Sequence, residues 1–327
     1  MKSRELLLII AIAGLLLNGC KQEVTVAESK LTGINPLSYT DVVYMASRDT
    51  VLVSTFSGRI AQRIKGNENE EVIAQLSDEI HGLAYDQKNQ LIYATTLQSG
   101  IVIIDLNTKS IVDSLPVSDS WISEIYLSKN GEILGGYSAH RENFLWNLKS
   151  KTLVELPESL NSFRIAGMDE KGYFLLKGNG KFVTWNPDDN QVEKEISLTG
   201  SLKDIDDDGN MLLFLDKEFQ FYSGKSDSVA FRKQHPDWPY FVKEQEEAIR
   251  IPLQLSLTVG QLTEKYIFTA GVDRSIRKWS LTDGELVKDI LDHKATISAM
   301  DCAENQSQIV SVDLKGGIVF SEVNSDD

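Results

Sequence analysis

The sequence contains little cysteine and has a deficit of positive charge. Its two cysteines, Cys20 and Cys302, can form at most one disulfide, so stability must come from a hydrophobic core. Lysine and arginine number 33 against 48 aspartate and glutamate residues, which gives a net charge of −15 at pH 7. A chain this acidic repels nucleic acid and anionic lipid headgroups. DNA or RNA binding is therefore excluded as a main role.

The apolar run at the N-terminus, from Leu6 to Leu17, is too short to cross a membrane as a helix. It has about 12 residues, whereas a hydrocarbon core about 30 Å thick requires about 20. Lys2 and Arg4 precede the run, and small residues end it. This arrangement is typical of an export signal that is cleaved from the mature protein.

The end of this signal, residues 17–20 (Leu-Asn-Gly-Cys), resembles the lipobox of bacterial lipoproteins, although Asn18 stands where a small residue is usual. The resemblance implies that residues 1–19 are removed and that Cys20 becomes an acylated N-terminus, held on a membrane by its acyl chains. The alternative is an ordinary secretory signal that happens to contain a cysteine. Lys21 follows, and not the aspartate that retains lipoproteins at the inner membrane in enterobacteria-like systems. An outer-membrane anchor facing the periplasm is therefore expected if the source is Gram-negative.

Beyond the signal, the chain repeats one unit several times. The clearest copy, residues 121–134, is an alternating apolar strand, a polar turn with Asn130-Gly131 and a second strand. The same hairpin recurs at residues 80–92, 163–175, 202–213 and 297–310. Third strands of shared shape follow at residues 100–105, 144–147, 182–186, 219–222 and 276–280, and a more polar fourth strand closes most units. The period, about 39 to 47 residues, is typical of four-stranded propeller blades.

In spacing, nearly the whole mature chain resembles the WD40-like β-propellers. The motif of that family is clearest in the unit from Tyr266 to Trp279, with His293 after it. In WD40-like blades, a turn aspartate, a strand tryptophan and a Gly-His dipeptide hydrogen-bond to one another. The resemblance implies these blade-bonding roles for four residues: Asp273, Trp279, His293 and Asp313.

The repeat predicts an all-β, seven-bladed propeller. Its units begin near Asp41, Ile80, Ile122, Phe163, Leu202, Ile249 and Ile297. The seventh unit ends without an outer strand, and residues 23–27 (Glu-Val-Thr-Val-Ala) are expected to supply it and so to close the ring. Six blades is the alternative, if the weak first unit is not a blade. The expected organisation is a signal peptide (1–19), a lipidated N-terminus with linker and closing strand (20–36), and a monomeric propeller (37–327).

Two patterns bear on metal binding, and neither meets the requirements of a site. Residues 204–209 open like a calcium loop, but Asp208-Gly209 falls at a hairpin turn of the repeat, and Leu215 stands where a bidentate glutamate is required. The histidines lie in four different units without metal-binding spacing: His81, His140, His235 and His293. Ring closure could still bring His140 and His293 toward one face. We predict no metal and no other cofactor.

A local catalytic motif is also missing. The sequence has no G-x-S-x-G elbow, and Cys302 lies in a predicted core strand. Propellers can nevertheless draw catalytic ligands from separate blades, so the absence of a local motif lowers the odds of an enzyme without excluding one.

The most informative irregularity is residues 232–248, which interrupt the repeat between the fifth and sixth units. This segment gathers aromatic residues between two prolines and a charged run, and we expect an inserted loop. Insertions in repeat proteins map to loops on one face, often the binding face, and Trp and Tyr recur at interface hot spots. The candidate partner-binding residues are His235, Trp238, Tyr240 and Phe241. The alternative is that these rings fold down and plug the propeller rim.

Members of the WD40-like class mostly serve as platforms for other proteins. The resemblance therefore implies a membrane-anchored scaffold or accessory factor of the cell envelope that binds a partner protein. The rival is an enzyme or cofactor-handling protein with a central-channel site, either lactonase-like or lyase-like, or concerned with quinones or redox-enzyme maturation. A third interpretation is ligand or glycan sensing through the face that carries His140 and Arg141.

Overall fold

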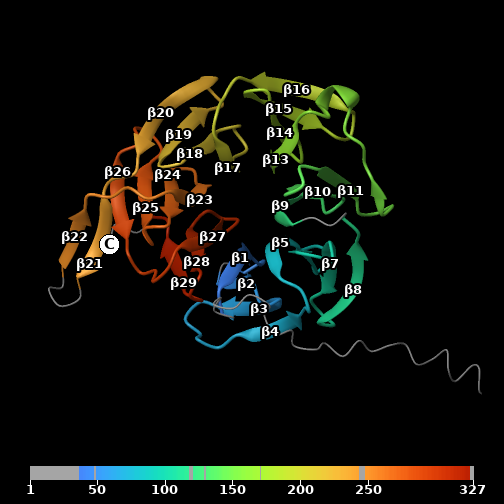
Figure 1. Ribbon diagram of the computed structural model, residues 1–327, viewed down its shortest axis with the longest axis horizontal. Coiled ribbons are helices and arrows are strands. Elements are labelled where there is room, and N and C mark those ends of the chain that lie inside the picture. Colours follow the sequence, from blue (N-terminus) through green and yellow to red (C-terminus); the bar gives the residue numbers. More distant parts are fainter. Residues whose placement is uncertain are drawn as a thin grey trace, which may run out of the picture.

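Seven small antiparallel sheets surround a central axis in the computed structural model, as the blades of a seven-bladed β-propeller (Figure 1). The structure describes residues 37–47, 49–117, 121–128, 130–169, 171–242 and 247–324. Apart from one turn of 3-10 helix, η1 (Glu158–Leu160), the elements of these ranges are strands. The prediction of an all-β propeller with seven rather than six blades is confirmed.

Each blade is a meander whose strands run in sequence order from the axis outward. Blade 1 comprises β1 (Tyr39–Tyr44), β2 (Thr50–Thr55), β3 (Arg59–Ile64) and β4 (Glu71–Gln75). Blade 2 comprises β5 (Ile80–Asp86), β6 (Leu91–Thr96), β7 (Ile101–Asp105) and β8 (Ser110–Leu115). Blade 3 comprises β9 (Ile122–Leu127), β10 (Ile133–Ser138), β11 (Asn143–Asn147) and β12 (Thr152–Leu153). Blade 4 comprises β13 (Arg164–Met168), β14 (Phe174–Gly178), β15 (Lys181–Asn186) and β16 (Gln191–Ile196).

The remaining blades follow the same order, and one additional hairpin lies between two of them. Blade 5 comprises β17 (Ser201–Ile205), β18 (Met211–Leu215), β19 (Glu218–Ser223) and β20 (Ser228–Gln234). The hairpin consists of β21 (Trp238–Val242) and β22 (Glu247–Ile251). Blade 6 comprises β23 (Leu257–Leu262), β24 (Tyr266–Gly271), β25 (Ile276–Ser280) and β26 (Leu286–Ile290). Blade 7 comprises β27 (Ile297–Cys302), β28 (Gln308–Asp313) and β29 (Ile318–Glu322).

The core of the propeller lies between its blades. Buried apolar residues form a cluster in each of the seven interfaces between neighbouring blades, such as Leu52 and Ile60 of blade 1 against Ile92 of blade 2. A middle strand such as β2 is buried along nearly its whole length because neighbouring blades cover both of its faces. Outer strands such as β8 face solvent and are mostly exposed. This gradient explains why the fourth strand of each repeat is the most polar.

Every innermost strand carries a β-bulge near its first residue. The pairing with the second strand skips one residue in each blade, and we call these seven the bulge residues: Thr40, His81, Ser123, Ala166, Lys203, Thr258 and Ser298. A bulge bends the strand and redirects the side chain of the extra residue. Six of the bulge residues line the central channel: Thr40, His81, Ala166, Lys203, Thr258 and Ser298.

Blade 7 closes the ring against blade 1, where the red and blue ends of the described chain meet in Figure 1. The Ser298 hydroxyl donates to the carbonyl oxygen of Tyr39 (2.7 Å), and the Ser38 hydroxyl donates to that of Leu314 (2.5 Å). No described strand pairs with the outer edge of β29, which is half-buried, whereas the corresponding strands β7 and β25 are almost completely buried. Residues 23–27, the expected closing strand, lie outside the described residues.

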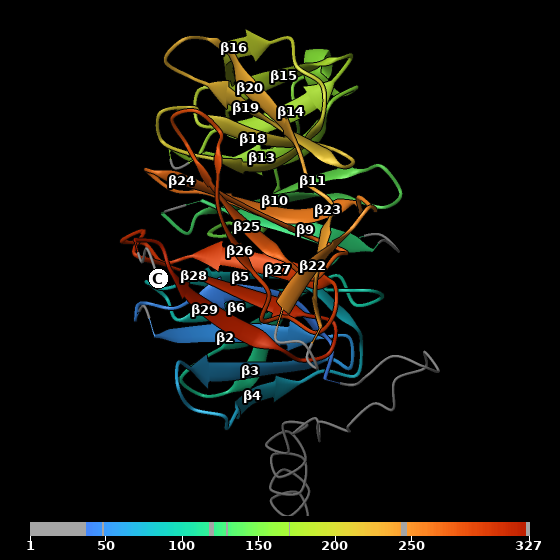
Figure 2. The same ribbon diagram turned by 90° about the vertical axis from the view of Figure 1, so that its left-hand side faces the viewer.

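The insertion between blades 5 and 6 is a hairpin rather than a simple loop. Strands β21 and β22 stand outside the ring next to blade 6 (Figures 1 and 2). The prediction that the sixth unit begins at Ile249 is wrong, because Ile249 lies in β22 and the innermost strand of blade 6 begins at Leu257. The apolar alternation of residues 247–251 fits any half-buried strand. Only packing against the ring distinguishes a blade strand from a strand of the insertion.

Candidate functional site

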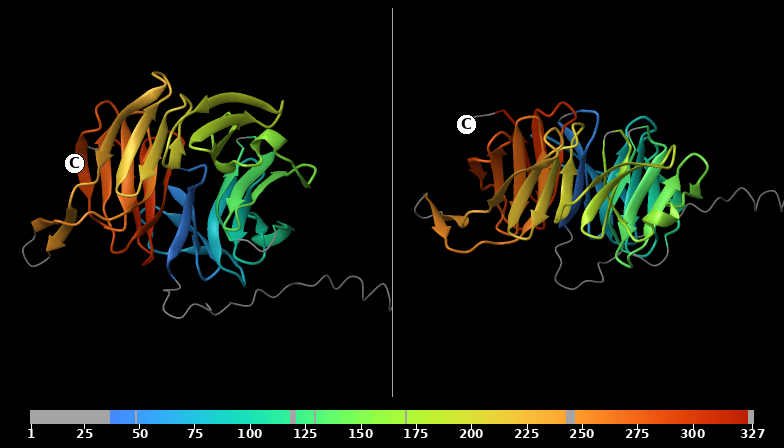
Figure 3. Two further views of the ribbon diagram at one scale, coloured as in Figure 1. Left: turned by 45° about the horizontal axis from the view of Figure 1, so that its top comes forward. Right: turned by 90° about the horizontal axis from the view of Figure 1, so that it is seen from above.

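Chain direction assigns the loops of a propeller to its two faces. Because successive strands of a blade alternate in direction, the turns between second and third strands lie on the same face as the connections between blades. Strands β21 and β22 form one of these connections, so we call this side the hairpin face. Leu37, the first described residue, leads into β1 on the hairpin face. Figure 3 shows the hairpin projecting beyond the body of the blades.

A central channel of about 540 Å³ runs between the innermost strands. Among its lining residues are three acidic ones, Asp41, Glu124 and Asp204, and one basic one, Lys203. Lys203 Nζ lies 5.7 Å from the centroid of the Phe214 ring, a cation–π contact. The described wall of the channel therefore carries an excess of carboxylates.

Three carboxyl groups join innermost strands of neighbouring blades. Asp41 accepts the backbone N–H of Leu83 (2.7 Å), Asp204 that of Leu262 (2.6 Å), and Asp301 that of Tyr44 (2.6 Å). Burial raises the pKa of Asp41 and Asp204 to about 7 and that of Asp301 to about 6, because desolvation outweighs these hydrogen bonds. These carboxyls stabilise the ring, and their protonation falls in the range near neutral pH.

The hairpin has two chemically different faces. Tyr240 pairs with Ile249 across the ladder, and Trp238 pairs with Ile251, so these four side chains share one face. Tyr240 is 43% exposed and Ile249 is 41% exposed. Arg250 belongs to the opposite face, since side chains alternate along a strand. We call the side of the hairpin that carries Tyr240 and Ile249 its apolar side.

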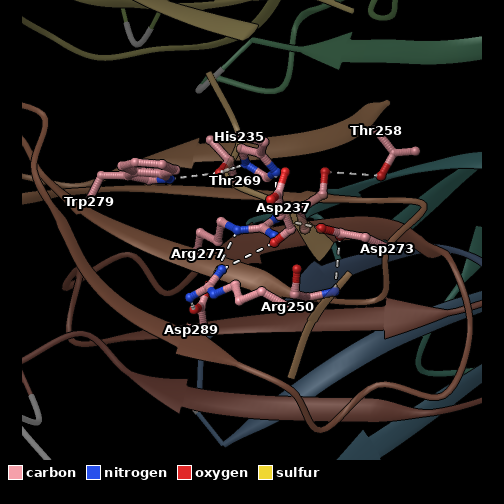
Figure 4. Close-up of polar contacts among 11 residues, drawn as sticks. His235, Asp237, Arg250, Thr258, Thr269, Asp273, Arg277, Trp279 and Asp289 are labelled. Atoms are coloured by element: carbon pink, nitrogen blue, oxygen red, sulfur yellow. Dashed lines mark hydrogen bonds and ion pairs between the residues drawn. The ribbon is translucent and has the colours of Figure 1, made fainter. Parts of the chain in front are cut away.

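Ionic and aromatic contacts mount the hairpin on blade 6, and Figure 4 shows the ionic one, between Arg250 and Asp289. The Arg250 guanidinium forms an ion pair with Asp289 of β26 and donates to the carbonyl oxygen of Asp237 (3.2 Å). On the other face of the hairpin, Arg274 lies over the Trp238 ring, 5.7 Å from its centroid. Contacts on both faces therefore hold the hairpin in one orientation relative to blade 6.

His235 lies inside blade 6 and not on its surface. The residue is 1% exposed, and its Nε2 lies 2.6 Å from the Thr269 hydroxyl, which also accepts the Trp279 indole N–H (2.8 Å). The Nδ1 atom of His235 accepts from Arg277 (2.5 Å), which places the ring proton on Nε2. Burial, together with the Arg277 charge, holds the pKa of His235 well below its usual range. The prediction that His235 contacts a partner is therefore corrected: its ring is a buried, neutral part of the blade.

Arg277 connects this blade network to the hairpin mount. Its side chain is fully buried and contacts the Asp273 carboxylate (2.6 Å) and, at 3.3 Å, that of Asp289. Asp289 is also the partner of Arg250. One buried guanidinium thus joins the centre of blade 6 to the base of the hairpin (Figure 4).

A second network of the same kind lies in blade 7. His293 Nδ1 is 3.1 Å from the Asp313 carboxylate, and His293 Nε2 is 2.7 Å from the Ser311 hydroxyl. Burial opposes ionisation of Asp313, but hydrogen bonds from His293 and from three backbone N–H groups outweigh it and lower the pKa of Asp313. Asp273, Trp279, His293 and Asp313 all make polar contacts within their own blades.

The histidine that serves each of these blades precedes its blade in the sequence. His235 serves the blade of Asp273 and Trp279, and His293 serves the following blade. Arg277 and Asp289 were not identified from the sequence. An arginine between Ile276 and Trp279 in a buried strand is the signal that could have identified Arg277, because a buried cation requires a partner.

The other candidate residues occupy different places. Cys20 lies outside the described residues, and for Phe241 only the backbone, paired with Ala248, is described. In the segment that opens like a calcium loop, residues 204–209, two carboxylates serve separate structural roles. Asp204 accepts a backbone N–H of the next blade, whereas Asp206 accepts backbone N–H groups of its own turn. Within the described ranges, no group of three or more His, Cys, Asp or Glu side chains could hold a metal ion. None of the described helices is long and apolar enough to cross a membrane.

Comparison of the sequence with protein-family models and with curated proteins finds no match. The fold and the side chains of this chain therefore carry the functional argument. The fold defines a class, the seven-bladed β-propellers, and the hairpin with its mount is the feature that departs from the blade repeat.

Proposed function

We propose that this protein is a lipid-anchored β-propeller of the cell envelope that acts as a platform for a partner protein. The apolar side of the hairpin is the proposed contact surface. The observation that carries the proposal is the exposure of Tyr240 and Ile249 on a strand pair that is fastened to the ring through Arg250 and Arg274. A rigidly mounted surface loses little conformational entropy on binding, and tyrosine contributes large contact area at low entropic cost.

The segment that follows the proposed anchor joins the ring at Leu37, on the hairpin face. Sixteen residues, 21–36, separate Cys20 from Leu37 on the hairpin face. An extended chain of that length spans at most about 60 Å. An acylated Cys20 would therefore hold Leu37 within that reach of a membrane and favour a partner that is itself at the membrane surface.

The contact surface is tested by in-cell crosslinking from the hairpin, followed by isolation of the crosslinked species. Replacing Tyr240 and Ile249 with alanine should abolish recovery of the partner and leave the melting temperature near that of the wild type, because both side chains are exposed. Val72→Ala together with Val112→Ala is the matched control, because these exposed apolar residues lie on outer strands of blades 1 and 2. Undiminished recovery with the hairpin variant would reject this contact face.

The anchor is tested separately by fractionation. Cys20→Ala should release the protein from the membrane fraction, because no acyl chain can then be attached. A wild-type protein that is recovered in the soluble fraction and carries no acyl mass would contradict the lipoprotein assignment without affecting the hairpin proposal.

A further inference from the structure

The bulge residue of blade 2 differs from the bulge residues of blades 6 and 7. The hydroxyl groups of Thr258 and Ser298 each donate to a backbone carbonyl at the start of the next blade, Ile297 (2.7 Å) and Tyr39 (2.7 Å) respectively. In blade 2 the bulge position is occupied by His81. An imidazole is too large to replace the short hydroxyl group that links neighbouring blades at this position. The His81 ring instead lines the mouth of the channel on the hairpin face.

Aromatic residues from three neighbouring blades meet at this position. The Phe56 ring lies edge-on to His81 with centroids 5.7 Å apart, and Trp121 stacks at a tilt on the other side at 5.0 Å. Phe56 belongs to the turn after β2, and Trp121 immediately precedes β9. Trp121 is 49% exposed, so one large aromatic face remains open to the channel mouth.

The polar atoms of this cluster lack a complete set of partners. The His81 side chain is 9% exposed, and its Nε2 is buried without a hydrogen-bond partner among the described residues. The nearest carboxylate oxygen, on Glu79, is 3.9 Å from Nε2, beyond hydrogen-bond distance. Burial lowers the pKa of His81 against the opposing charge of Asp78, which favours the neutral ring, and a neutral imidazole offers one acceptor nitrogen. A hydrogen-bond donor placed between His81 Nε2 and the Glu79 carboxylate would satisfy both acceptors.

We propose that this mouth, which is lined by Phe56, His81 and Trp121 and has the Glu79 carboxylate 3.9 Å from His81 Nε2, binds a primary ammonium or guanidinium group carried on an apolar stem. The cation donates one N–H to His81 Nε2 and another to the Glu79 carboxylate, while the stem lies against the Trp121 ring. A lysine or arginine side chain of another protein and a free alkylamine both present this chemistry. The net charge of −15 favours the approach of a cation from solution.

The site is independent of the proposed contact surface on the hairpin. It is built from blades 1, 2 and 3, whereas the hairpin is mounted on blade 6. Tyr240→Ala should therefore leave cation binding unchanged, so failure of one proposal can be distinguished from failure of the other.

Calorimetric titration of the full-length protein in non-ionic detergent tests the proposal with n-butylamine and n-butylguanidine as cations. Binding with a dissociation constant on the order of 1 mM is expected for ligands of this size. The neutral analogue 1-butanol and the anion butyrate should bind at least about tenfold more weakly, because they lose a charge-assisted hydrogen bond. If 1-butanol binds as tightly as n-butylamine, the site is merely apolar and the proposal is wrong.

Two substitutions locate the site. His81→Phe keeps a ring but removes Nε2, and Glu79→Gln keeps the shape but removes the charge. Each should weaken n-butylamine binding by about tenfold or more, while Glu132→Gln, an exposed residue on the opposite face, should not. Should one variant fail to fold, the other still decides the outcome. Unchanged affinity in a folded variant of either kind would overturn the proposal.

The source of the cation is distinguished with a short neutral peptide that contains one central lysine. Tighter binding of this peptide than of n-butylamine would support a side chain of a partner protein, since neighbouring residues would add contacts. Equal binding would support a free amine.

Discussion

Removing the charge of Asp273 should destabilise the propeller far more than removing an exposed charge. Asp273 is 4% exposed and lies 2.6 Å from the fully buried Arg277 guanidinium. Asp273→Asn preserves shape but leaves that cation without its nearest counter-charge. Loss of one partner of a buried ion pair costs about 3 to 5 kcal/mol.

The lower end of this range applies here. The reason is that a second carboxylate, that of Asp289, remains 3.3 Å from Arg277 after the substitution. Asp289 compensates only in part, because its side chain is partly exposed and also pairs with Arg250. We therefore expect a loss of about 3 kcal/mol in the free energy of unfolding. For a propeller of this size (residues 37–327), such a loss lowers the melting temperature by roughly 5 °C.

Urea denaturation of the wild type, Asp273→Asn and Glu285→Gln measures this difference. Glu285 pairs with Lys233 at 2.7 Å but is 74% exposed, so its substitution should cost less than about 1 kcal/mol. The double variant Asp273→Asn with Arg277→Met should recover part of the lost stability, because it removes the buried cation as well. A loss below about 1 kcal/mol in Asp273→Asn would refute the role assigned to this pair.

Two further predictions concern the ring as a whole. Because Asp41, Asp204 and Asp301 have raised pKa values, about 7, 7 and 6 against 3.8 when unfolded, the folded state binds more protons than the unfolded state between these values. Their contribution to the free energy of unfolding should be complete below pH 3.8 and decline as pH rises through 6 to 7, and the triple Asp→Asn variant should lose this decline in urea titrations from pH 5 to 8. If residues 23–27 complete blade 7, a chain beginning at residue 37 should melt at a lower temperature than one beginning at residue 21, and equal melting temperatures would contradict the closing strand.

Strand positions were predictable because each strand carries its own pattern. Residues 80–92 and 297–310 form hairpins as expected, since alternation and turn residues specify such structures locally. The sixth blade was misplaced for the same reason, because residues 247–251 alternate like a blade strand although they belong to the insertion. Alternation of apolar and polar residues shows that one face of a strand is covered, but it does not show which part of the protein covers that face.

The side-chain networks were only partly predictable. Asp273, Trp279, His293 and Asp313 were identified as blade-bonding residues, but the histidine of blade 6, His235, was assigned to the surface. Its contacts with Thr269 and Arg277 join residues 34 and 42 positions apart. Because His235 is close to Trp238 in the sequence, both were assigned to one exposed aromatic segment. In the structure His235 lies inside blade 6, whereas Trp238 lies in the hairpin.

The sequence by itself determined the repeating four-stranded sheet, because periodicity and turn chemistry act over a few residues, whereas the tertiary structure decided for seven blades over six. Only the tertiary structure decided which residues meet across blades, such as Phe56, His81 and Trp121 at the channel mouth. Ring closure places side chains from separate repeats side by side, and no local pattern records that placement. The same closure buries Arg277 and exposes Tyr240, because neighbouring blades cover the interior of blade 6 while the hairpin stands outside the ring.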